Sequence, residues 1–480
     1  RDITLGTQQP ISPSPGVNRK AHSMQTVVII GGDAAGMSAA SKIKRERKEA
    51  DVIVYERGEH ISFSACGMPY WIGGTIESDE DLLVLTPEVA RNKRGIDVRM
   101  RHEVTAINRA DKTVEVRNLD TGEPSTQVYD KLVIATGASA VRPPIPGMDL
   151  PGVFTLRALS DSQRMYAYMA ETTPQAAVVI GGGYIGVEMA EALIDRGLEV
   201  HIVEMLPQIM PNFDADMVDE VTDHLREKGV QLHLGVGSNG VSKLDGRLAV
   251  GLGDTKEAIV ADLVLVSVGV RPNSQLAADA GLALGRSKAI LVDDHMHTTD
   301  PDIYAAGDCV EHHHIVLDED VWIPLAPSAN KGGRIVGENI SGSDTAFPGI
   351  LGTAVVKVFD YTMSVTGLTE RAAVASGKYG SEGEFVGSAA ISAYDKAHYW
   401  PGAEKIKAKL VIDKRDGRIL GAQLVGKAGV NKRIDIVATA ITAGLTVDQL
   451  ALLDLSYAPP YSPVYDPVQV CAGVVMKQVM

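Results

Sequence analysis

One cysteine in this 480-residue chain stands in a setting that suits redox chemistry. Cys66 lies in the segment ISFSACGMPYWIGG, ten residues after Glu56, where serine, glycine and proline predict a loop that leads into a helix. A thiol at the N-terminus of a helix ionises more readily and is then a nucleophile near neutral pH. The alternative for a free cysteine is a small buried apolar side chain, the role we assign to Cys309 and Cys471. From residue type and setting alone, both interpretations remain open for Cys66.

A nucleotide-binding pattern occurs twice in the sequence. Residues 26–56 read as a strand, the turn GGDAAG, a helix and a strand that ends in Glu56; residues 177–204 repeat this order with the turn GGGYIG and Glu204. Such a βαβ unit binds a dinucleotide because N–H groups at the helix start meet the pyrophosphate, while the acid accepts ribose hydroxyls. One such pattern alone would also fit a turn without a ligand, but its duplication favours two bound dinucleotides.

The two turns differ in one glycine. The second contains all three glycines of G-x-G-x-x-G, namely Gly181, Gly183 and Gly186. In the first, Gly31 and Gly36 fit, but Asp33 occupies the middle position, close to where a pyrophosphate is expected. Glu204 is followed by Met-Leu-Pro-Gln, without an arginine for a 2′-phosphate, which favours NADH over NADPH.

Both patterns end with similar segments, KLVIATGASAVRPP (131–144) and DLVLVSVGVRPN (262–273). Each segment has an apolar strand, then a glycine and then Arg-Pro. A later strand, PDIYAAGDC (301–309), ends in Gly307 and Asp308, where a carboxylate can hold a polyol hydroxyl such as that of a flavin ribityl chain. The alternative for Asp308 is a helix N-cap. A helix expected to begin near Ser328 could stabilise an anionic reduced flavin with its N-terminus.

These patterns predict an α/β protein with two Rossmann-like dinucleotide-binding domains and a C-terminal α+β domain. Because the second pattern precedes the 301–309 strand, we expect it to be inserted into the first domain. The expected parts are a flexible leader over residues 1–23, a first domain formed by 24–146 and 270–345, a second over 147–269, and the C-terminal domain over 346–480.

Composition excludes several classes of function. The formal net charge of −15 comes without a block of basic residues, which argues against nucleic-acid binding. The sequence has no apolar run of the ~18 residues that a membrane span needs. Three scattered cysteines predict neither a disulfide framework nor a zinc site, and we expect no metal and a reducing, cytoplasmic location.

The runs GGDAAGMSAASKIKR, SFSACGMPY, KLVIATGA, GGGYIGVE, IYAAGD and YAPPYSPVYDPV together resemble the pyridine nucleotide-disulfide oxidoreductases, over essentially the whole chain after Met24. Some members of that family carry two cysteines as C-x4-C, but Ile61 and Trp71 stand five residues either side of Cys66. The chain therefore resembles the single-cysteine branch, closest to coenzyme A-disulfide reductases and NADH-dependent persulfide or polysulfide reductases. That resemblance implies FAD in the first domain, NADH or NADPH in the second, coenzyme A at the thiol, and a homodimer formed by the C-terminal domain.

The resemblance also implies roles for particular residues. Tyr184 resembles a tyrosine that stacks over the flavin until the nicotinamide displaces it, with Glu188 one helical turn further on. The other positions expected to contact the two dinucleotides, besides the glycines, acids and Asp308 named above, are Arg57, Val104, Thr136, Gly137, Ala326, Ile185 and Gly269.

A substrate rim is implied around the thiol. The positions matching a coenzyme A phosphate rim are Ser38, Lys42, Arg45, Ser62 and Arg94, with His313 near the thiol. Ala65 and Tyr465 stand where an asparagine and a lysine are usual, so the rim is thinner, and Lys42 and Arg45 would also fit a solvated helix face.

Two tyrosines, Tyr399 and Tyr457, match residues that reach the thiol from the partner subunit and protonate a leaving thiolate. Aromatic packing is the alternative for both, and Tyr461 is a nearby candidate. The implied reaction takes electrons from NADH through FAD to Cys66, which reduces coenzyme A disulfide or a related disulfide, persulfide or polysulfide. The alternatives are an NADH oxidase or peroxidase working through a cysteine sulfenic acid, and a flavin redox sensor or electron-relay protein.

Overall fold

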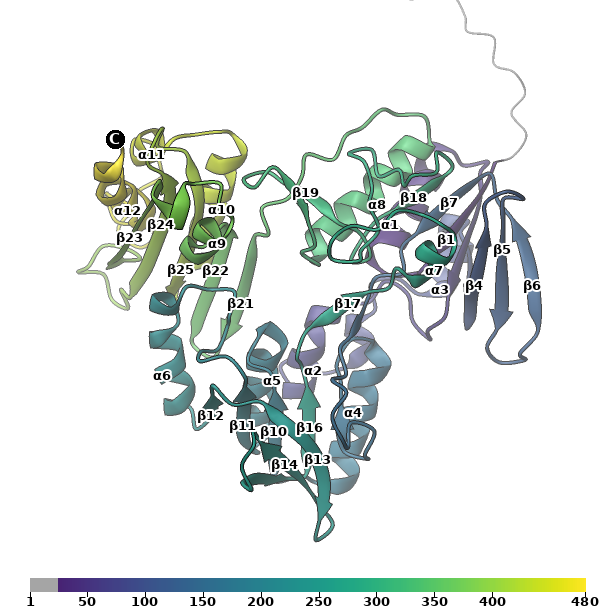
Figure 1. Ribbon diagram of the computed structural model, residues 1–480, viewed down its shortest axis with the longest axis horizontal. Coiled ribbons are helices and arrows are strands. Elements are labelled where there is room, and N and C mark those ends of the chain that lie inside the picture. The colour runs from purple at the N-terminus through teal and green to yellow at the C-terminus, as the bar shows by residue number, and fades with distance from the viewer. Residues whose placement is uncertain (1–24) are drawn as a thin grey trace, which may run out of the picture.

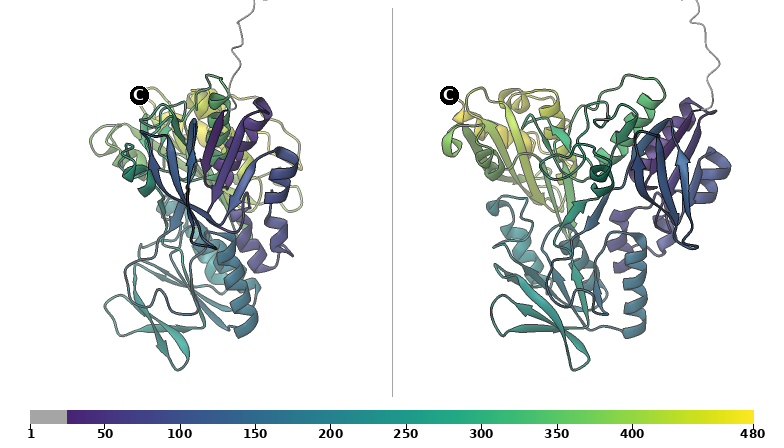
Figure 2. Two further views of the ribbon diagram at one scale, coloured as in Figure 1. Left: turned by 90° about the vertical axis from the view of Figure 1, so that its right-hand side faces the viewer. Right: turned by 45° about the vertical axis from the view of Figure 1, so that its right-hand side comes forward.

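The computed structural model describes residues 25–480, and the expected leader over residues 1–23 lies outside the described part. Three lobes are visible in Figure 1, one at the upper right, one at the bottom and one at the upper left. Figure 2 shows the same molecule from two further sides. Between residues 25 and 480, no helix has both the length and the apolar character needed to cross a membrane.

The first lobe is built on a parallel sheet whose strands are almost continuous apolar runs, as expected for a sheet that is buried on both faces. Its strands, in spatial order, are β18 (Ile303–Ala305), β7 (Lys131–Ile134), β1 (Thr26–Ile30), β2 (Asp51–Glu56) and β3 (Asp97–Met100). One face is covered by α1 (Ala34–Glu46), α3 (Pro87–Arg94) and α8 (Ala326–Ile340). The other face is covered by α7 (Gln275–Asp279) and by the antiparallel strands β4 (His102–Asn108), β5 (Thr113–Asn118) and β6 (Pro124–Val128).

Helices α1 and α8 pack unusually closely, because glycines of α8 face α1. A Cβ atom on Gly333 would lie 2.1 Å from the carbonyl oxygen of Ala35, and one on Gly337 would lie 2.6 Å from Cβ of Lys42. The helix expected to begin near Ser328 begins at Ala326. Glycine is therefore required at both positions for this contact.

The second lobe repeats the arrangement. Its parallel strands, in spatial order, are β12 (Gln231–Leu234), β11 (Glu199–Glu204), β10 (Ala176–Ile180), β16 (Leu263–Val266) and β9 (Val153–Phe154). Helices α4 (Leu159–Thr172), α5 (Tyr184–Asp195) and α6 (Asp219–Glu227) and the antiparallel strands β13 (Ser238–Leu244), β14 (Arg247–Leu252) and β15 (Ala258–Ala261) complete the lobe. All these elements lie between β7 and β18, which pair with each other in the first sheet.

The two closing motifs of the repeat lie side by side. Strand β8 (Ala138–Ala140) leads toward the second lobe and β17 (Val270–Pro272) returns from it, and the two pair antiparallel with Ser139 opposite Arg271. The chain thus crosses between the lobes on a hydrogen-bonded two-stranded ribbon.

The third lobe is an antiparallel sheet with helices. Its strands, in spatial order, are β21 (Ala354–Val358), β22 (Tyr361–Gly367), β25 (Ile419–Gly426), β24 (Lys405–Asp413) and β23 (Val386–Tyr394). Helices α9 (Glu370–Ala375), α10 (Val430–Thr442), α11 (Val447–Ala451) and α12 (Pro467–Val475) belong to it, and the hairpin of β19 (His312–His314) and β20 (Glu319–Val321) precedes it. The predicted fold class, with two parallel Rossmann-like sheets and a C-terminal α+β part, is confirmed.

Two buried histidines should make the protein sensitive to acid. Burial lowers the pKa of both His312 and His314 to about 4, and among the described residues neither ring nitrogen of His312 has a hydrogen-bond partner. A base with a lowered pKa binds fewer protons in the folded state than in the unfolded state. The free energy of unfolding is therefore unaffected by these histidines above about pH 6.5. Between about pH 6.5 and pH 4 it falls with decreasing pH, by about 1.4 kcal/mol per pH unit for each histidine.

We expect His312→Phe to weaken this pH dependence. The difference in thermal midpoint between pH 7 and pH 5 should be smaller in the variant than in the wild type, because one buried base has been removed. Equal differences in the two proteins would contradict the assignment.

Candidate active site

Cys66 lies at the junction of the first two lobes. It is in the 3-10 turn η1 (Ala65–Gly67), which continues directly into α2 (Met68–Gly73), so the predicted loop and helix are present. Its side chain is exposed, whereas Cys309 and Cys471 are fully buried. Although the residue is exposed, the surrounding protein removes part of the water around its sulfur, and this partial desolvation raises the pKa of the Cys66 thiol. The nearby carboxyls of Glu188, Asp308 and Asp33 raise the pKa further, while Arg157 lowers it. The direction is opposite to the easier ionisation expected for a thiol at a helix N-terminus.

Helix α2 packs on the second lobe, although it follows β2 of the first. Figure 1 shows it beside α4 and α5, and its buried side chains Met68, Trp71 and Ile72 belong to an apolar cluster that is built mainly from the second lobe and also includes side chains of the third. The helices approach closely, because a Cβ atom on Gly73 would lie 3.1 Å from Cα of Ala192 in α5. The cysteine is therefore held between the two expected dinucleotide sites.

The first glycine turn has the tight geometry that the motif requires. Gly31 has φ +106°, and a Cβ atom there would lie 2.1 Å from the carbonyl oxygen of Ala135; one on Gly36 would lie 1.9 Å from the carbonyl oxygen of Gly31. Glu56 accepts hydrogen bonds from the backbone N–H groups of Gly32 at 2.8 Å and Gly58 at 2.6 Å. Its carboxylate is thus fixed beside the turn.

Asp33 is the N-cap residue of α1, at the place where the sequence lacks the middle glycine. Burial raises the pKa of its carboxyl to about 6, and the charge of Glu56 adds to this effect, while Arg157 opposes it. A protonated Asp33 would remove a negative charge from a helix N-terminus that suits a pyrophosphate.

The second turn also fits a pyrophosphate. A Cβ atom on Gly181 would lie 2.5 Å from the carbonyl oxygen of Ser267, and one on Gly186 would lie 2.0 Å from the carbonyl oxygen of Gly181. A Cβ atom on Gly183 would have nothing within 4 Å, so the middle glycine borders open space at the start of α5. Glu204 accepts from the N–H groups of Gly182 at 2.7 Å and Leu206 at 2.8 Å.

Tyr184 and Glu188 occupy the first turns of α5. The hydroxyl oxygen of Tyr184 accepts a hydrogen bond from Nδ2 of Asn212 at 2.5 Å, and burial raises the pKa of this tyrosine to about 12. Burial raises the pKa of Glu188 to about 7, and Oη of Tyr70 in α2 donates to its carboxylate at 3.4 Å. The sequence did not single out Asn212, which belongs to no motif, and it gave no role to Tyr70, although this residue ends the run SFSACGMPY.

Asp308 carries an ion pair that the sequence did not reveal. It accepts from Nη2 of Arg157 at 2.7 Å, and Arg157 also donates through Nε to the carbonyl oxygen of Ala138 at 3.0 Å. Arg157 lies just before α4 and thereby connects that helix to β8 and to the segment that follows β18. Its positive charge partly offsets the raised pKa values of Cys66 and Asp33.

The remaining positions predicted to contact dinucleotides lie in several elements of the first two lobes. Thr136 donates to the carbonyl oxygen of Asn273 at 2.6 Å, and the carbonyl of Gly269 accepts from the N–H of Val141 at 2.9 Å, so the β8 and β17 crossings are tied together. Gly137 and Gly307 have positive φ. Arg57 is exposed directly after β2, whereas Val104 is buried in β4. Ile185 lies in the first turn of α5, and Ala326 is the first residue of α8.

The predicted substrate rim lies mainly along α1. Lys42 pairs with Glu46 at 2.8 Å and Glu338 at 3.0 Å, and these hydrogen bonds raise its pKa. Arg94 donates to Oγ of Ser41 at 2.9 Å, and Arg45 donates to the carbonyl oxygen of the same residue. Ser38 donates to Oδ1 of Asn330 at 2.9 Å. Ser62 has φ +46°, and Nε2 of His313 lies 3.5 Å from the carboxylate of Asp318. The structure thus brings Arg45 and Arg94 to Ser41, whereas Ser38 is bonded to Asn330 of α8 and Lys42 is neutralised by two acids.

The predicted tyrosines lie on the third lobe and share one surface pocket. Tyr399 is 65% exposed and Tyr457 is 49% exposed, and a hydrogen bond between them raises the pKa of Tyr457. The pocket has a volume of about 230 Å³ and is also lined by Tyr394, His398 and Tyr465. Both hydroxyls are therefore presented on the lobe's surface rather than buried in its core.

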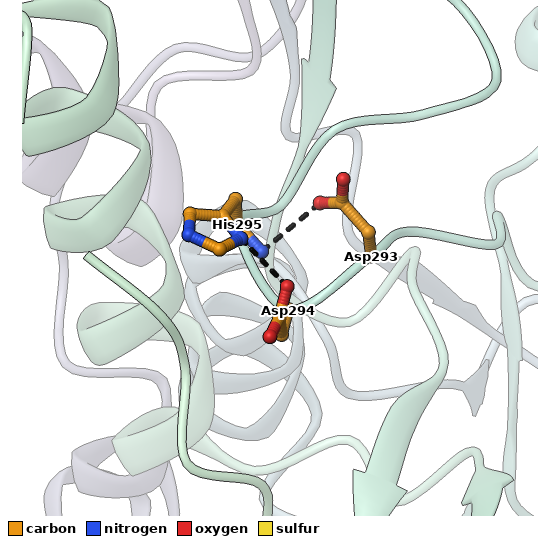
Figure 3. Close-up of side chains that lie close together, drawn as sticks. All are labelled: Asp293, Asp294 and His295. Carbon is orange, nitrogen blue, oxygen red and sulfur yellow. Dashed lines mark hydrogen bonds and ion pairs between the residues drawn. The ribbon is translucent and has the colours of Figure 1, made fainter. Parts of the chain in front are cut away.

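One side-chain cluster among residues 25–480 could hold a metal ion, formed by Asp293, Asp294 and His295 (Figure 3). Nδ1 of His295 lies 2.6 Å from Asp294, and Nε2 lies 2.9 Å from Asp344, so both ring nitrogens already face carboxylates. This exposed group is an ion-pair cluster, and we assign it no part in the redox site.

Comparison with known proteins gives a consistent result. The sequence pattern described as pyridine nucleotide-disulphide oxidoreductase matches residues 25–333, and that of the pyridine nucleotide-disulphide oxidoreductase dimerisation domain matches residues 353–467. The NAD(P)H sulfur oxidoreductase (CoA-dependent) of Pyrococcus furiosus is 42% identical over 93% of this chain and 98% of its own. The coenzyme A disulfide reductase of Staphylococcus haemolyticus is 32% identical over 92% and 96%. The structure of a NAD-dependent persulfide reductase from A. fulgidus has 41% identity and a TM-score of 0.90, over 94% of this chain and 83% of that one.

Proposed function

Because the chain belongs to the pyridine nucleotide-disulphide oxidoreductase family, we propose that it is a homodimeric FAD enzyme that uses NADH to reduce coenzyme A disulfide, or a related persulfide or polysulfide, through Cys66. The observation that carries the proposal is the exposed thiol of Cys66 between two glycine turns that fit pyrophosphates. The relatives named for coenzyme A and sulfur substrates support this substrate class.

The first turn, with Gly31, Gly36 and Glu56, would hold FAD, and the second, with Gly183 and Glu204, would hold the nicotinamide dinucleotide. When bound, these two groups would supply the electron pair that breaks the S–S bond between Cys66 and coenzyme A, which returns Cys66 to the thiolate and releases coenzyme A as the thiol. Asp308, fixed by Arg157, would orient the ribityl hydroxyls, and the Tyr184 ring would cover the flavin until nicotinamide enters.

Cys66 performs the sulfur chemistry. Its thiolate attacks one sulfur of the incoming disulfide; a new S–S bond to Cys66 forms, the old S–S bond breaks, and a thiolate leaves. Tyr399 or Tyr457 of the partner subunit supplies the proton to that thiolate. Arg45 and Arg94, which both donate to Ser41, would bind the coenzyme A phosphates together with Ser38.

The test is intact-mass measurement of the purified protein before and after a thiol reductant. A mass that falls by that of one coenzyme A per chain, with the loss absent in Cys66→Ser, supports the proposal. Loss of a single oxygen atom would instead identify a sulfenic acid, as in the oxidase or peroxidase alternative, and an unchanged mass with slow turnover of coenzyme A disulfide would favour a redox sensor.

Cofactor preference gives an independent prediction. Glu204 places a negative charge beside the adenosine ribose site, and the side chains of Met205 to Gln208 carry no positive charge. We expect Glu204→Gln to reduce the NADH:NADPH ratio of kcat/KM by about tenfold, or about 1.4 kcal/mol, because repulsion of the 2′-phosphate is lost while one acceptor for the loop N–H groups remains. An unchanged ratio would show that another group sets the preference.

A further inference from the structure

The loop formed by residues 205–214, which follows β11, lies on the second glycine turn. The N–H of Met210 donates to the carbonyl oxygen of Gly182 at 2.8 Å, and a Cβ atom on Gly182 would lie 3.3 Å from Cγ2 of Ile209. Ile209, Met210 and Phe213 are fully buried in an apolar cluster to which the second and third lobes both contribute. The loop is therefore fixed beside the site that we propose for the nicotinamide dinucleotide.

The end of this loop is anchored to the third lobe through Asp214. Gln423 of β25 bonds to this residue twice: its Oε1 accepts from the backbone N–H of Asp214 at 2.7 Å, and its Nε2 donates to the carboxylate at 2.6 Å. Nζ of Lys409 in β24 lies 3.2 Å from the same carboxylate, and both of these side chains are only 6% exposed. Arg371 of α9 also donates to the carbonyl oxygen of Pro211. Side chains and backbone of the third lobe thus hold two positions of the loop.

Asn212 lies between these two held positions, and its side chain is exposed. Its Nδ2 donates to the hydroxyl oxygen of Tyr184 at 2.5 Å. Tyr184 is the first residue of α5, directly after the N-cap glycine of the second turn. If the Tyr184 ring must move aside before the nicotinamide can reach the flavin, this hydrogen bond has to break in the same movement.

We propose that Asn212 is a positioning residue that holds the Tyr184 ring over the flavin, and that the third lobe sets the place of Asn212 through its contacts with Pro211 and Asp214. The inference rests on the proposed function, in which the Tyr184 ring covers the flavin until nicotinamide enters. Because the hydrogen bond exists only while the ring covers the flavin, it stabilises the covered state, and NADH binds at the expense of that state. The affinity for NADH is therefore lower than it would be without Asn212.

The test is a double-mutant cycle of Asn212→Ala and Tyr184→Phe in the FAD holoenzyme, because each substitution removes one partner of the hydrogen bond. Stopped-flow absorbance near 450 nm over a range of NADH concentrations gives the Kd of NADH and the limiting rate of flavin reduction. We expect each single variant to lower the Kd by about two- to tenfold, as for the loss of a neutral hydrogen bond, with the limiting rate unchanged. The double variant should have the Kd of the single variants, because the same bond can be lost only once.

The fluorescence of the oxidised flavin, measured without NADH, is a second readout. A phenol ring stacked on a flavin quenches its emission by electron transfer, so a ring that is held less firmly should increase the emission of Asn212→Ala. Asn239→Ala is the matched control, since Asn239 is an exposed asparagine of β13 in the same lobe and its Nδ2 donates to the carbonyl oxygen of Gly253. We expect the Kd and the emission of this control to equal those of the wild type.

An unchanged Kd in Asn212→Ala, together with altered readouts in Tyr184→Ala, would overturn the proposal. A raised Kd in Asn212→Ala would also overturn it, because Asn212 would then contact the dinucleotide itself. If Tyr184→Ala changed neither readout, the covering role given to Tyr184 in the proposed function would be wrong, and the role of Asn212 with it. No disulfide is present in these measurements, so a failure of the sulfur chemistry, seen as full turnover in Cys66→Ser, is recognised separately.

Discussion

Cys66→Ser is expected to abolish disulfide and persulfide reduction, by roughly 10³-fold or more in kcat, and to leave reduction of the flavin by NADH intact. The hydroxyl of serine is far less acidic than a thiol and forms no exchangeable bond to sulfur, so the substrate step is lost. The second glycine turn, which we propose to bind the nicotinamide dinucleotide, is packed against Ser267, and no atom of Cys66 is among the nearest neighbours of its glycines. Stopped-flow absorbance near 450 nm measures the first half-reaction, and thiol release measures the second.

Cys309→Ser is the matched control. Cys309 is fully buried, and its thiol donates to the carbonyl oxygen of Ala306, a contact that a hydroxyl can keep. We expect wild-type turnover from this variant with a small loss of stability. Turnover retained in Cys66→Ser would remove the basis of the proposed mechanism and favour a flavoprotein that passes electrons directly to another protein.

Gly183→Val is expected to weaken NADH binding by about 10- to 150-fold without loss of the fold. A side chain at this position meets no protein atom within 4 Å, so the packing of α5 is preserved. It would fill the space in which the pyrophosphate meets the start of the helix, and loss of a hydrogen bond to a charged group costs about 1.5–3 kcal/mol. Titration of NADH against the quenching of flavin fluorescence gives the Kd.

Gly186→Ala provides the contrast. Its Cβ atom would lie 2.0 Å from the carbonyl oxygen of Gly181, so the turn itself must shift. We expect a lower thermal midpoint for Gly186→Ala and an unchanged one for Gly183→Val. If Gly183→Val bound NADH as the wild type does, the second turn would not be the nicotinamide site.

Much of the architecture could be predicted because its determinants are local. The turns GGDAAG and GGGYIG, the apolar runs before them and the glutamates after them predicted both βαβ units, whose strands and helices the structure places within a few residues of the expected bounds. The similar segments KLVIATGASAVRPP and DLVLVSVGVRPN, which close the two patterns, also predicted that two lobes would share one arrangement. The pairing of β8 with β17 was not anticipated, because it joins segments that are more than 120 residues apart.

The position of α2 shows the limit of such reasoning. Its sequence follows the first βαβ unit, but its apolar side chains Met68, Trp71 and Ile72 pack among buried apolar side chains of α4 and α5 in the second lobe. A short apolar run specifies that a segment is buried without specifying the partner.

By itself, the sequence determined the fold class, the two glycine turns and a redox candidate at Cys66, because glycine patterns, hydrophobic periodicity and residue chemistry act over a few neighbouring positions. Only the tertiary structure decided what surrounds the thiol. The Arg157–Asp308 ion pair spans 151 residues and the Tyr70–Glu188 hydrogen bond spans 118, and both exist because the lobes pack in one particular way. Such contacts follow from the shape of the buried surfaces, which no local spacing in the chain encodes.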